Sequence, residues 1–250
     1  MKNLTSEVCS YLFPPDSRIF RDSGIPNSLD ILQRTVIVVG DIGSGKSTLA
    51  KSLYLEMTKR YPCPCFTTKL LIGRLDTLLD ESVLESVFRD PDMKMVKKVI
   101  LFNDDITLER YNRETLMNYF RVRHLFHKTL GWRKGLIVNL LCSHRLLAVP
   151  KELRSHVKVI IFRSTPPPSY DYSYVKRLIG EDALKTLYQW EKSRDKYDRD
   201  WNKSLVWYYG ESGYIELPPP RGVRLVQEKV NFKYRVSRLD AYDRGEVWFF

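Results

Sequence analysis

The 250-residue sequence has few of the features that define several large classes of protein. Its four cysteines are too few to form a disulfide framework in a chain of this length. No apolar run approaches the ~20 residues that cross a bilayer, and the first ten residues lack the pattern of a signal peptide. No internal repeat is evident either. These absences argue against a disulfide scaffold, a membrane-spanning protein and a repeat protein, so we expect a soluble, cytoplasmic globular protein.

Acidic residues are scarce in the middle of the chain. The whole sequence has 41 Lys+Arg and 30 Asp+Glu, a formal charge of +11. Residues 106–165 carry twelve basic and three acidic side chains, whereas residues 1–105 carry fourteen of each. This local excess favours a phosphate-rich partner, and a solvated basic face is the alternative interpretation.

The order of apolar runs predicts an α/β fold. The β-branched run 35–39 is typical of a strand that is buried on both faces of a parallel sheet. Further strands are predicted at 99–102, 136–142 and 157–162, and they alternate with helices at 46–60 and 107–130. Residues 66–73 fit either a strand or a helix. This alternation predicts a parallel sheet flanked by helices.

The sequence pattern changes on either side of this core. We expect residues 34–165 to form the core and residues 1–33 to be an irregular or short-helical segment packed on it. Residues 166–250 are predicted to form an extension, with a charged helical stretch at 171–200 and a basic, aromatic tail. A hairpin is expected between them, with strands at 204–209 and 214–217 joined by a four-residue loop.

The segment Gly40–Ser47 matches the phosphate-binding pattern G-x-x-x-x-G-K-[ST] in full. A strand is predicted before it and a helix after it, as this loop requires. Its glycines allow backbone N–H groups to turn toward phosphates, Lys46 can reach the β- and γ-phosphates, and the Ser47 hydroxyl can bind Mg²⁺. We therefore predict ATP and Mg²⁺ as ligands. The predicted nucleotide contacts are Gly40, Asp41, Ile42, Gly43, Ser44, Gly45, Lys46, Ser47 and Thr48.

Two adjacent carboxylates follow the predicted strand 99–102. We assign Asp104 to the Mg²⁺ site, directly or through water, and Asp105 to orienting or activating the attacking water. A second acid beside the metal-site residue favours hydrolysis over nucleotide binding alone. An ordinary strand-end turn is the alternative.

Polar residues also end the predicted strand 136–142. Either Ser143 or His144 could contact both the γ-phosphate and the attacking water. A basic residue nearby could project into the nucleotide of a neighbouring subunit and stabilise charge in the transition state. For that role Arg154 is the first choice and Arg145 the second.

Taken in order, these motifs resemble the HerA/FtsK group of RecA-like P-loop ATPases. The resemblance covers residues 34–165 and rests on the loop, the acidic pair, Ser143-His144-Arg145 and Val149-Pro150-Lys151. Where that group has Gln and Glu, this chain has His144 and Asp105. Small ATPases of archaeal viruses and plasmids show a similar acidic pair before a Tyr- and Arg-rich helix. Residues 149–155 also resemble AAA+ proteins, including DnaA-like initiators.

What the resemblance implies is a P-loop NTPase core of the RecA-like (ASCE) type. It further implies an oligomeric ring, usually a hexamer, that moves or remodels DNA with ATP. An AAA+ switch that acts on a protein, a small-molecule kinase and a non-catalytic nucleotide-binding module are the alternatives.

The helix 107–130 has a basic stripe opposite an apolar one. This basic stripe could contact DNA, a neighbouring subunit or water. The C-terminal tail could stack on single-stranded bases or pack as an amphipathic arm. The DNA contacts predicted outside the tail are Arg110, Arg113, Arg121 and Lys128.

Overall fold

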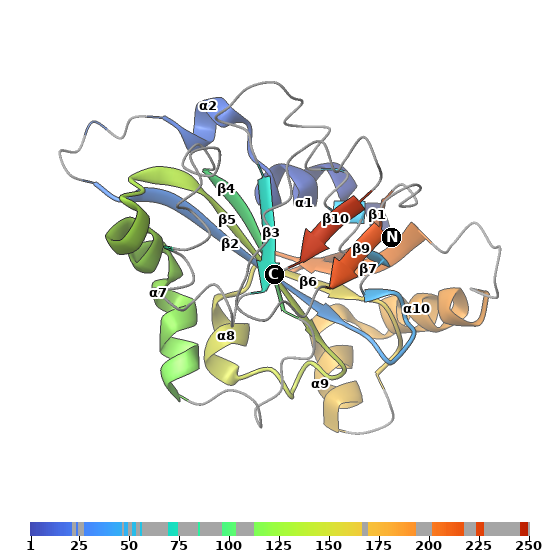
Figure 1. Ribbon diagram of the computed structural model, residues 1–250. Coiled ribbons are helices and arrows are strands. Elements are labelled where there is room, and N and C mark those ends of the chain that lie inside the picture. Colours follow the sequence, from blue (N-terminus) through green and yellow to red (C-terminus); the bar gives the residue numbers. More distant parts are fainter. Residues whose placement is uncertain are drawn as a thin grey trace.

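The computed structural model describes residues 1–21, 24, 28–46, 48–49, 52–53, 56, 70–74, 85, 97–103, 113–166, 170–193, 202–217, 224–227 and 246–249. In this part of the chain, eight strands form one sheet in the order β1-β8-β7-β6-β2-β5-β4-β3 (Figure 1). The strands are β1 Lys2–Asn3, β2 Asp30–Val39, β3 Leu70–Arg74, β4 Lys98–Asn103, β5 Lys134–Ser143, β6 Val159–Phe162, β7 Lys203–Tyr208 and β8 Glu211–Glu216, with β9 Arg224–Gln227 and β10 Glu246–Phe249 pairing separately. The helices are α1 Thr5–Leu12, α2 Asp16–Ile19, α7 Arg113–Leu130, α8 Lys151–His156, α9 Tyr170–Ile179 and α10 Glu181–Ser193.

The sheet is parallel except at one strand. Strands β3, β4, β5, β2 and β6 run in the same direction, while β7 is antiparallel to both β6 and β8. The predicted α/β fold is confirmed, and the ambiguous segment 66–73 contains a strand, β3. Because β3, β4, β5, β2 and β6 are parallel, their carboxyl ends lie at one edge of the sheet, and that edge is the usual place for a ligand.

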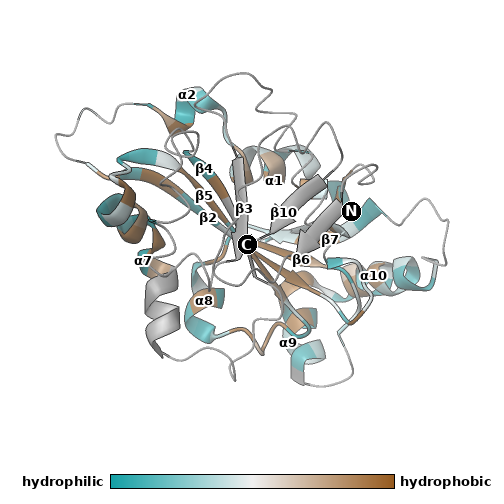
Figure 2. Cartoon of the chain, viewed as in Figure 1, coloured by the Kyte–Doolittle hydropathy of each residue, from teal (hydrophilic) through white to brown (hydrophobic). Residues whose placement is uncertain are grey.

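Helices cover both faces of the sheet. Along β2, Ile37 and Val39 pack toward α7, α8, α9 and α10, whereas Val36 and Val38 pack toward α1 and the helix after residue 45. All four of these side chains are at most 2% exposed. Each buried valine or isoleucine contributes about 1.5–3 kcal/mol to folding. Figure 2 shows the central strands as mostly hydrophobic, while the helices beside them carry both hydrophobic and hydrophilic residues.

The hairpin exists, but its predicted four-residue loop is wrong. Residues Glu211 and Gly213 belong to β8, opposite Tyr208 and Val206. The turn has two residues, Tyr209 at φ 50° and Gly210 at φ 95°. Positive φ at both positions matches the right-handed twist of the flanking strands.

Gly213 is a strand glycine because another strand approaches it closely. A Cβ at this position would lie 2.6 Å from the carbonyl oxygen of Lys2 in β1. The hairpin therefore extends the main sheet, and the first residues of the chain pair with its outer strand.

The charged stretch predicted to be helical at 171–200 contains two helices in its described part. Helix α9 ends before Gly180, which has φ 89° and donates its N–H to the carbonyl of Lys176. This left-handed residue is a common way for a helix to end. The break turns α10 back against α9, and both helices contribute to the core on the α7 and α8 face.

Candidate nucleotide-binding site

The phosphate-binding loop follows β2 at the carboxyl edge of the sheet. Strand β2 lies between β5 and β6, so the ends of these two strands flank the loop. Gly40 donates its N–H to the carbonyl of Ser143 at the end of β5, at 3.1 Å. The loop therefore starts beside Ser143 at the end of β5.

Three positions in this loop require glycine, two because of their backbone conformation and one because of a close approach. Gly43 and Gly45 have φ of 77° and 87°, a conformation that side chains rarely adopt. A Cβ at Gly40 would lie 2.4 Å from the Ser44 hydroxyl, so the loop closes tightly on itself there. The loop conformation thus depends on all three positions.

Lys46 is turned into the loop that precedes it. Its side chain is 9% exposed, and its Nζ donates to the carbonyls of Gly40 at 2.8 Å and Asp41 at 3.0 Å. The Asp41 carbonyl also accepts the N–H of Ser44, at 3.1 Å. The ammonium group is therefore held at the mouth of the loop.

These features fit the phosphates of a nucleotide. A helix begins at Lys46, and its first N–H groups together with its dipole favour an anion at this point. The loop provides a fixed cation, left-handed glycines and a helix N-terminus within a few residues. Thr48 is half-buried in the same helix.

The predicted metal ligands Ser47 and Asp104 lie outside the described residues, as does Asp105. Strand β4 ends at Asn103, which pairs with Leu141 of β5. Strand β5 therefore lies between the strand that carries the loop and the strand that leads to the acidic pair. The assignments of these three residues stay predictions.

The end of β5 has one engaged hydroxyl and one half-buried histidine. Ser143 is fully buried; its Oγ donates to the carbonyl of Arg145 at 2.8 Å and accepts the N–H of the same residue at 3.3 Å. His144 is half-buried, and Arg145 is exposed. This short turn holds Ser143 inside the protein and places the side chains of His144 and Arg145 nearer the surface.

A buried carboxylate from α9 supports this turn. Asp171 is 3% exposed and accepts the N–H groups of Leu147 at 2.8 Å and Leu146 at 3.3 Å. Sequence reasoning did not identify Asp171, because it is 26 residues beyond Arg145 in an unrelated helix. It fixes the backbone that follows the predicted site residues of β5.

Arg154, the first choice for a residue acting on a neighbouring subunit, is engaged within its own chain. Its Nε donates to the carbonyl of Val149 at 2.9 Å, and its guanidinium lies 5.2 Å from the ring centre of Tyr174. Arg145 is the more exposed of the two candidates.

Two further residues at the end of β6, neither of them predicted from the sequence, support the loop. Arg163 donates from Nε to the carbonyl of Ser44 at 3.0 Å, and the Ser164 hydroxyl accepts the N–H of Asp41 at 2.7 Å. The sequence feature that could have identified Arg163 and Ser164 is their position directly after a buried strand. Its relevance depends on β6 lying beside β2, which is a property of the tertiary structure.

Helix α7 presents opposite faces to the core and to the surface. Val122 and Phe126 are fully buried, whereas Arg121, His124 and Lys128 are exposed. The predicted basic stripe is confirmed for these positions. Arg110, the Arg113 side chain and most of the C-terminal tail lie outside the described residues.

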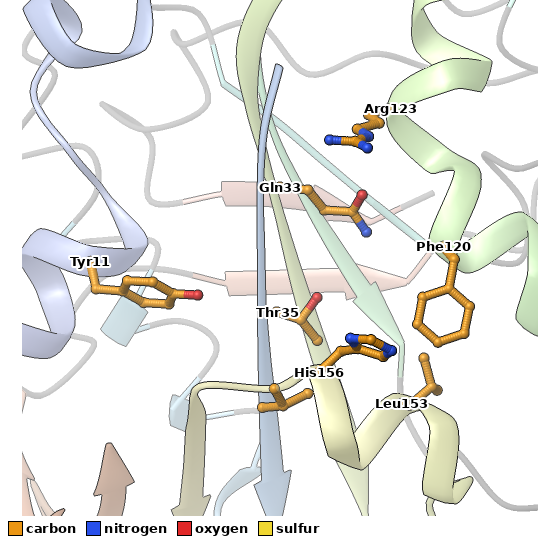
Figure 3. A pocket seen from close by; sticks show the side chains of 8 residues that line it. Tyr11, Gln33, Thr35, Phe120, Arg123, Leu153 and His156 are labelled. Atoms are coloured by element: carbon orange, nitrogen blue, oxygen red, sulfur yellow. The ribbon is translucent and has the colours of Figure 1, made fainter. Parts of the chain in front are cut away.

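The opposite, amino edge of the sheet contains a hollow of about 220 Å³ (Figure 3). Tyr11 lies on one side of β2, and Phe120 and Arg123 of α7 lie on the other. Strand β6 pairs with β2 only from Val36 onward, which leaves the stretch containing Gln33 unpaired by β6. The hollow is thus a gap beside the start of β6, at the far end of the strands from the phosphate-binding loop.

Aromatic rings and cations surround this amino edge. The Arg34 guanidinium lies 4.6 Å from the ring centre of Tyr11, which packs edge-on against Tyr208 and Tyr209. Burial raises the pKa of Tyr11 to about 12. These contacts describe a packed aromatic cluster, in contrast to the polar backbone cradle at the other edge.

No family model and no curated protein sequence matches this chain. Solved structures with a similar arrangement include the genome packaging NTPase B204 from Sulfolobus turreted icosahedral virus 2 in complex with ATP-gammaS. It is 12% identical with a TM-score of 0.45, over 75% of this chain and 98% of that one. The pCW3 conjugation coupling protein TcpA is 13% identical with a TM-score of 0.40, over 83% and 69% of the two chains.

A third neighbour is the cytoplasmic domain of the Type VII secretion ATPase EccC from Thermomonospora curvata. It is 14% identical with a TM-score of 0.41, over 74% of this chain and 25% of that one. These neighbours are HerA/FtsK-type P-loop ATPases, the group that the sequence resembles. At these levels of similarity, only the residues of this chain itself indicate its function.

Within the described ranges, no helix is both long enough and apolar enough to cross a membrane. The same part of the chain has no group of three or more His, Cys, Asp or Glu side chains placed to hold a metal ion.

Proposed function

We propose that this protein is a Mg²⁺-dependent ATPase that acts on DNA as an oligomer. The observation that carries the proposal is the position of Lys46. Its buried ammonium group is held by two loop carbonyls at the start of a helix, beside the end of β5. That arrangement binds the phosphates of ATP and stabilises the charge that develops when the terminal phosphate is transferred to water.

Each part of the site has one task in this proposal. The loop N–H groups and Lys46 bind and orient the phosphates. Ser47 and Asp104 would hold Mg²⁺, which, when bound, would neutralise charge on the β- and γ-phosphate oxygens. Asp105 orients the attacking water and accepts its proton.

The described contacts favour one candidate for each of the two remaining roles. The Ser143 hydroxyl is engaged with the backbone of Arg145, so we assign the contact with water and the γ-phosphate to His144. Arg154 is engaged with Val149 and Tyr174, so the exposed Arg145 is better placed to reach a neighbouring subunit. This second assignment reverses the order that the sequence suggested.

Exposed positive charge supports DNA as the partner. Residues 106–165 carry the excess of basic side chains, and Arg121 and Lys128 of α7 are exposed on the face opposite the buried residues of this helix. Contacts with phosphates depend on such cations and weaken as salt displaces them. A ring of subunits would bring this surface of several copies to one DNA molecule.

The first experiment measures ATP hydrolysis with and without double- or single-stranded DNA at low salt. We expect Mg²⁺-dependent hydrolysis that DNA stimulates. Lys46→Ala should lower turnover by at least about a hundredfold, the usual cost of losing a charge-stabilising donor. Lys185→Ala, at a lysine whose side chain is 65% exposed on α10, is the matched control and should leave turnover unchanged.

A second experiment tests the DNA surface. Charge reversal by Arg121→Glu and Lys128→Glu should weaken DNA binding and reduce the slope of its salt dependence by about one per lost phosphate contact. The basal rate of hydrolysis should stay the same. Normal DNA binding by both variants would show that α7 is not the DNA surface.

Hydrolysis without any stimulation by DNA would contradict the DNA part of the proposal. It would instead favour a protein partner, the alternative suggested by the likeness to AAA+ proteins. Phosphorylation of an added metabolite would favour a kinase.

A further inference from the structure

Arg163 is a buried arginine directly behind the phosphate-binding loop. Its residue is 2% exposed, although it follows the last residue of β6 at the edge of the sheet. Its backbone N–H donates to the carbonyl of Val39 at 2.7 Å, so it continues the pairing of β6 with β2. This pairing holds Arg163 beside the point where β2 becomes the loop.

The side chain of Arg163 joins the loop to the hairpin. Nε donates to the carbonyl of Ser44 in the loop, at 3.0 Å. Nη1 donates to the carbonyl of Lys203 at 3.1 Å and to the hydroxyl of Ser204 at 2.8 Å, both at the start of β7. Ser204 is itself fully buried. One planar guanidinium therefore connects two parts of the chain that are about 160 residues apart.

The hydrogen bond to Ser44 controls the direction of a group that faces the ligand. In a planar trans peptide, the carbonyl oxygen and the following N–H point in opposite directions. When Arg163 draws the Ser44 carbonyl toward β6, the N–H of Gly45 is turned the other way. In this loop pattern, that N–H is among the donors available to phosphate.

Gly45 and Arg163 are also fitted to each other. Gly45 has φ 87°, and a Cβ at this position would lie 2.8 Å from Nη2 of Arg163. A side chain at position 45 would therefore displace the guanidinium as well as strain the backbone. The second glycine of the motif leaves room for this arginine.

We propose that Arg163 is a positioning residue that holds the phosphate-binding loop in its ligand-binding shape and makes the β7–β8 hairpin part of the nucleotide site. The proposal rests on the proposed function, since it concerns the same nucleotide. Movement of the hairpin would shift Ser204 and Lys203, and through Arg163 it would change the position of the loop. Binding of phosphates to the loop would affect the hairpin through the same hydrogen bonds.

A purely structural role is the competing explanation, because a buried arginine also supports the fold. The two explanations differ in the kinetic constant that they change. Misplaced loop donors weaken binding of nucleotide in the ground and transition states alike, which raises KM and leaves kcat nearly unchanged. Loss of folded protein lowers the active fraction, which reduces the apparent kcat at constant KM.

The experiment compares four variants of the full chain. Arg163→Met should raise KM for ATP, and the Kd for the slowly hydrolysed analogue ATPγS, by about tenfold, which corresponds to about 1.4 kcal/mol. Arg163→Lys keeps the charge but has a single donor group that cannot bridge Ser44 and Ser204, so it should recover only part of the affinity. Ser204→Ala keeps the arginine and should give a smaller rise, of about twofold to threefold.

The matched control is Arg133→Met, the same substitution at an exposed arginine at the amino edge of the sheet. It should leave both constants unchanged. The proposal is wrong if Arg163→Met binds ATPγS as tightly as the wild type, or if its only effects are a lower melting temperature and a lower apparent kcat. Binding of ATPγS is measured independently of hydrolysis. A wild-type chain that binds the analogue without hydrolysing ATP would therefore contradict the ATPase proposal and still test Arg163.

Discussion

The two edges of the sheet use polar groups in different ways. At the carboxyl edge, buried polar side chains hold backbone groups in place: Arg163 and Ser164 hold the phosphate-binding loop, and Asp171 holds the turn after β5. At the amino edge, Tyr11 packs against Tyr208 and Tyr209, has the Arg34 guanidinium over its ring, and also lines the hollow. The hollow therefore lies away from the candidate site, which is a loop held by backbone and side-chain hydrogen bonds.

Stability at the amino edge depends in part on a buried ion pair. Lys98, the first residue of β4, is fully buried, and its Nζ lies 2.5 Å from Oδ1 of Asp16 at the start of α2. This pair connects the N-terminal segment to the strand that leads to the acidic pair. The two edges should therefore respond differently to substitution, the amino edge in stability and the carboxyl edge in nucleotide chemistry.

The largest effect on stability is expected from Asp16→Ala, which removes the Asp16 carboxylate from the buried ammonium group of Lys98. We expect the free energy of unfolding to fall by about 3 kcal/mol, the lower end of the range for a broken buried pair, because the Asp16 side chain is 34% exposed. Urea denaturation measures this change, and KM for ATP should stay the same wherever the variant is folded.

Glu7→Ala is the control for that variant, since it removes the surface pair between Glu7 and Lys2 in the same segment. It should leave the unfolding curve nearly unchanged. A large rise in KM for ATP in folded Asp16→Ala would contradict the separation between the two edges.

A smaller effect on stability, with a larger effect on activity, is expected from Asp171→Asn at the carboxyl edge. The amide keeps one oxygen, but its NH₂ group cannot accept the second backbone N–H. The free energy of unfolding should fall by about 1.5 kcal/mol, the scale of one hydrogen bond to a charged group. Because the turn presents His144 and Arg145, ATP turnover at saturating ATP should also decrease.

Steady-state kinetics and urea denaturation together test this variant. Asp182→Asn is the control, because Asp182 is in the first turn of α10 and its side chain is fully exposed. Normal turnover by destabilised Asp171→Asn would show that catalysis does not require both hydrogen bonds between Asp171 and the turn after β5.

The smallest effect is expected from Tyr11→Phe in the aromatic cluster. Burial raises the pKa of Tyr11 to about 12, above the value of about 10 in an unfolded chain. A raised pKa contributes stability that is complete below pH 10 and is lost as the pH rises toward 12. Tyr11→Phe should therefore weaken the loss of stability between pH 10 and 12.

Absorbance at 295 nm, which follows ionisation of tyrosine, provides the direct measurement. Tyr11→Phe should remove the component that titrates near pH 12, and Tyr188→Phe, at an exposed tyrosine of α10, should leave that component in place. A wild-type titration without a component above pH 11 would contradict the assignment.

The sequence predicted the parts of the fold that are local. The buried runs, the loop between them, and the opposed faces of α7 at Val122, Phe126 and Arg121 all follow from residue types at a fixed spacing. The turn of the hairpin was predicted wrongly, because Gly213 resembles a turn glycine in sequence. In the structure it gives room to the carbonyl of Lys2.

The residues of the candidate site divide in the same way, into those that local sequence predicts and those that depend on the tertiary structure. Sequence alone identified Lys46 and the glycines of the loop, since a phosphate cradle is a property of eight consecutive residues. It could not identify Arg163, Ser164 or Asp171, because their contacts depend on β6 lying beside β2 and on α9 packing under the end of β5. Strand order is set by how crossovers pack across the whole sheet, so only the tertiary structure determined which side chains hold the loop that the sequence had already specified.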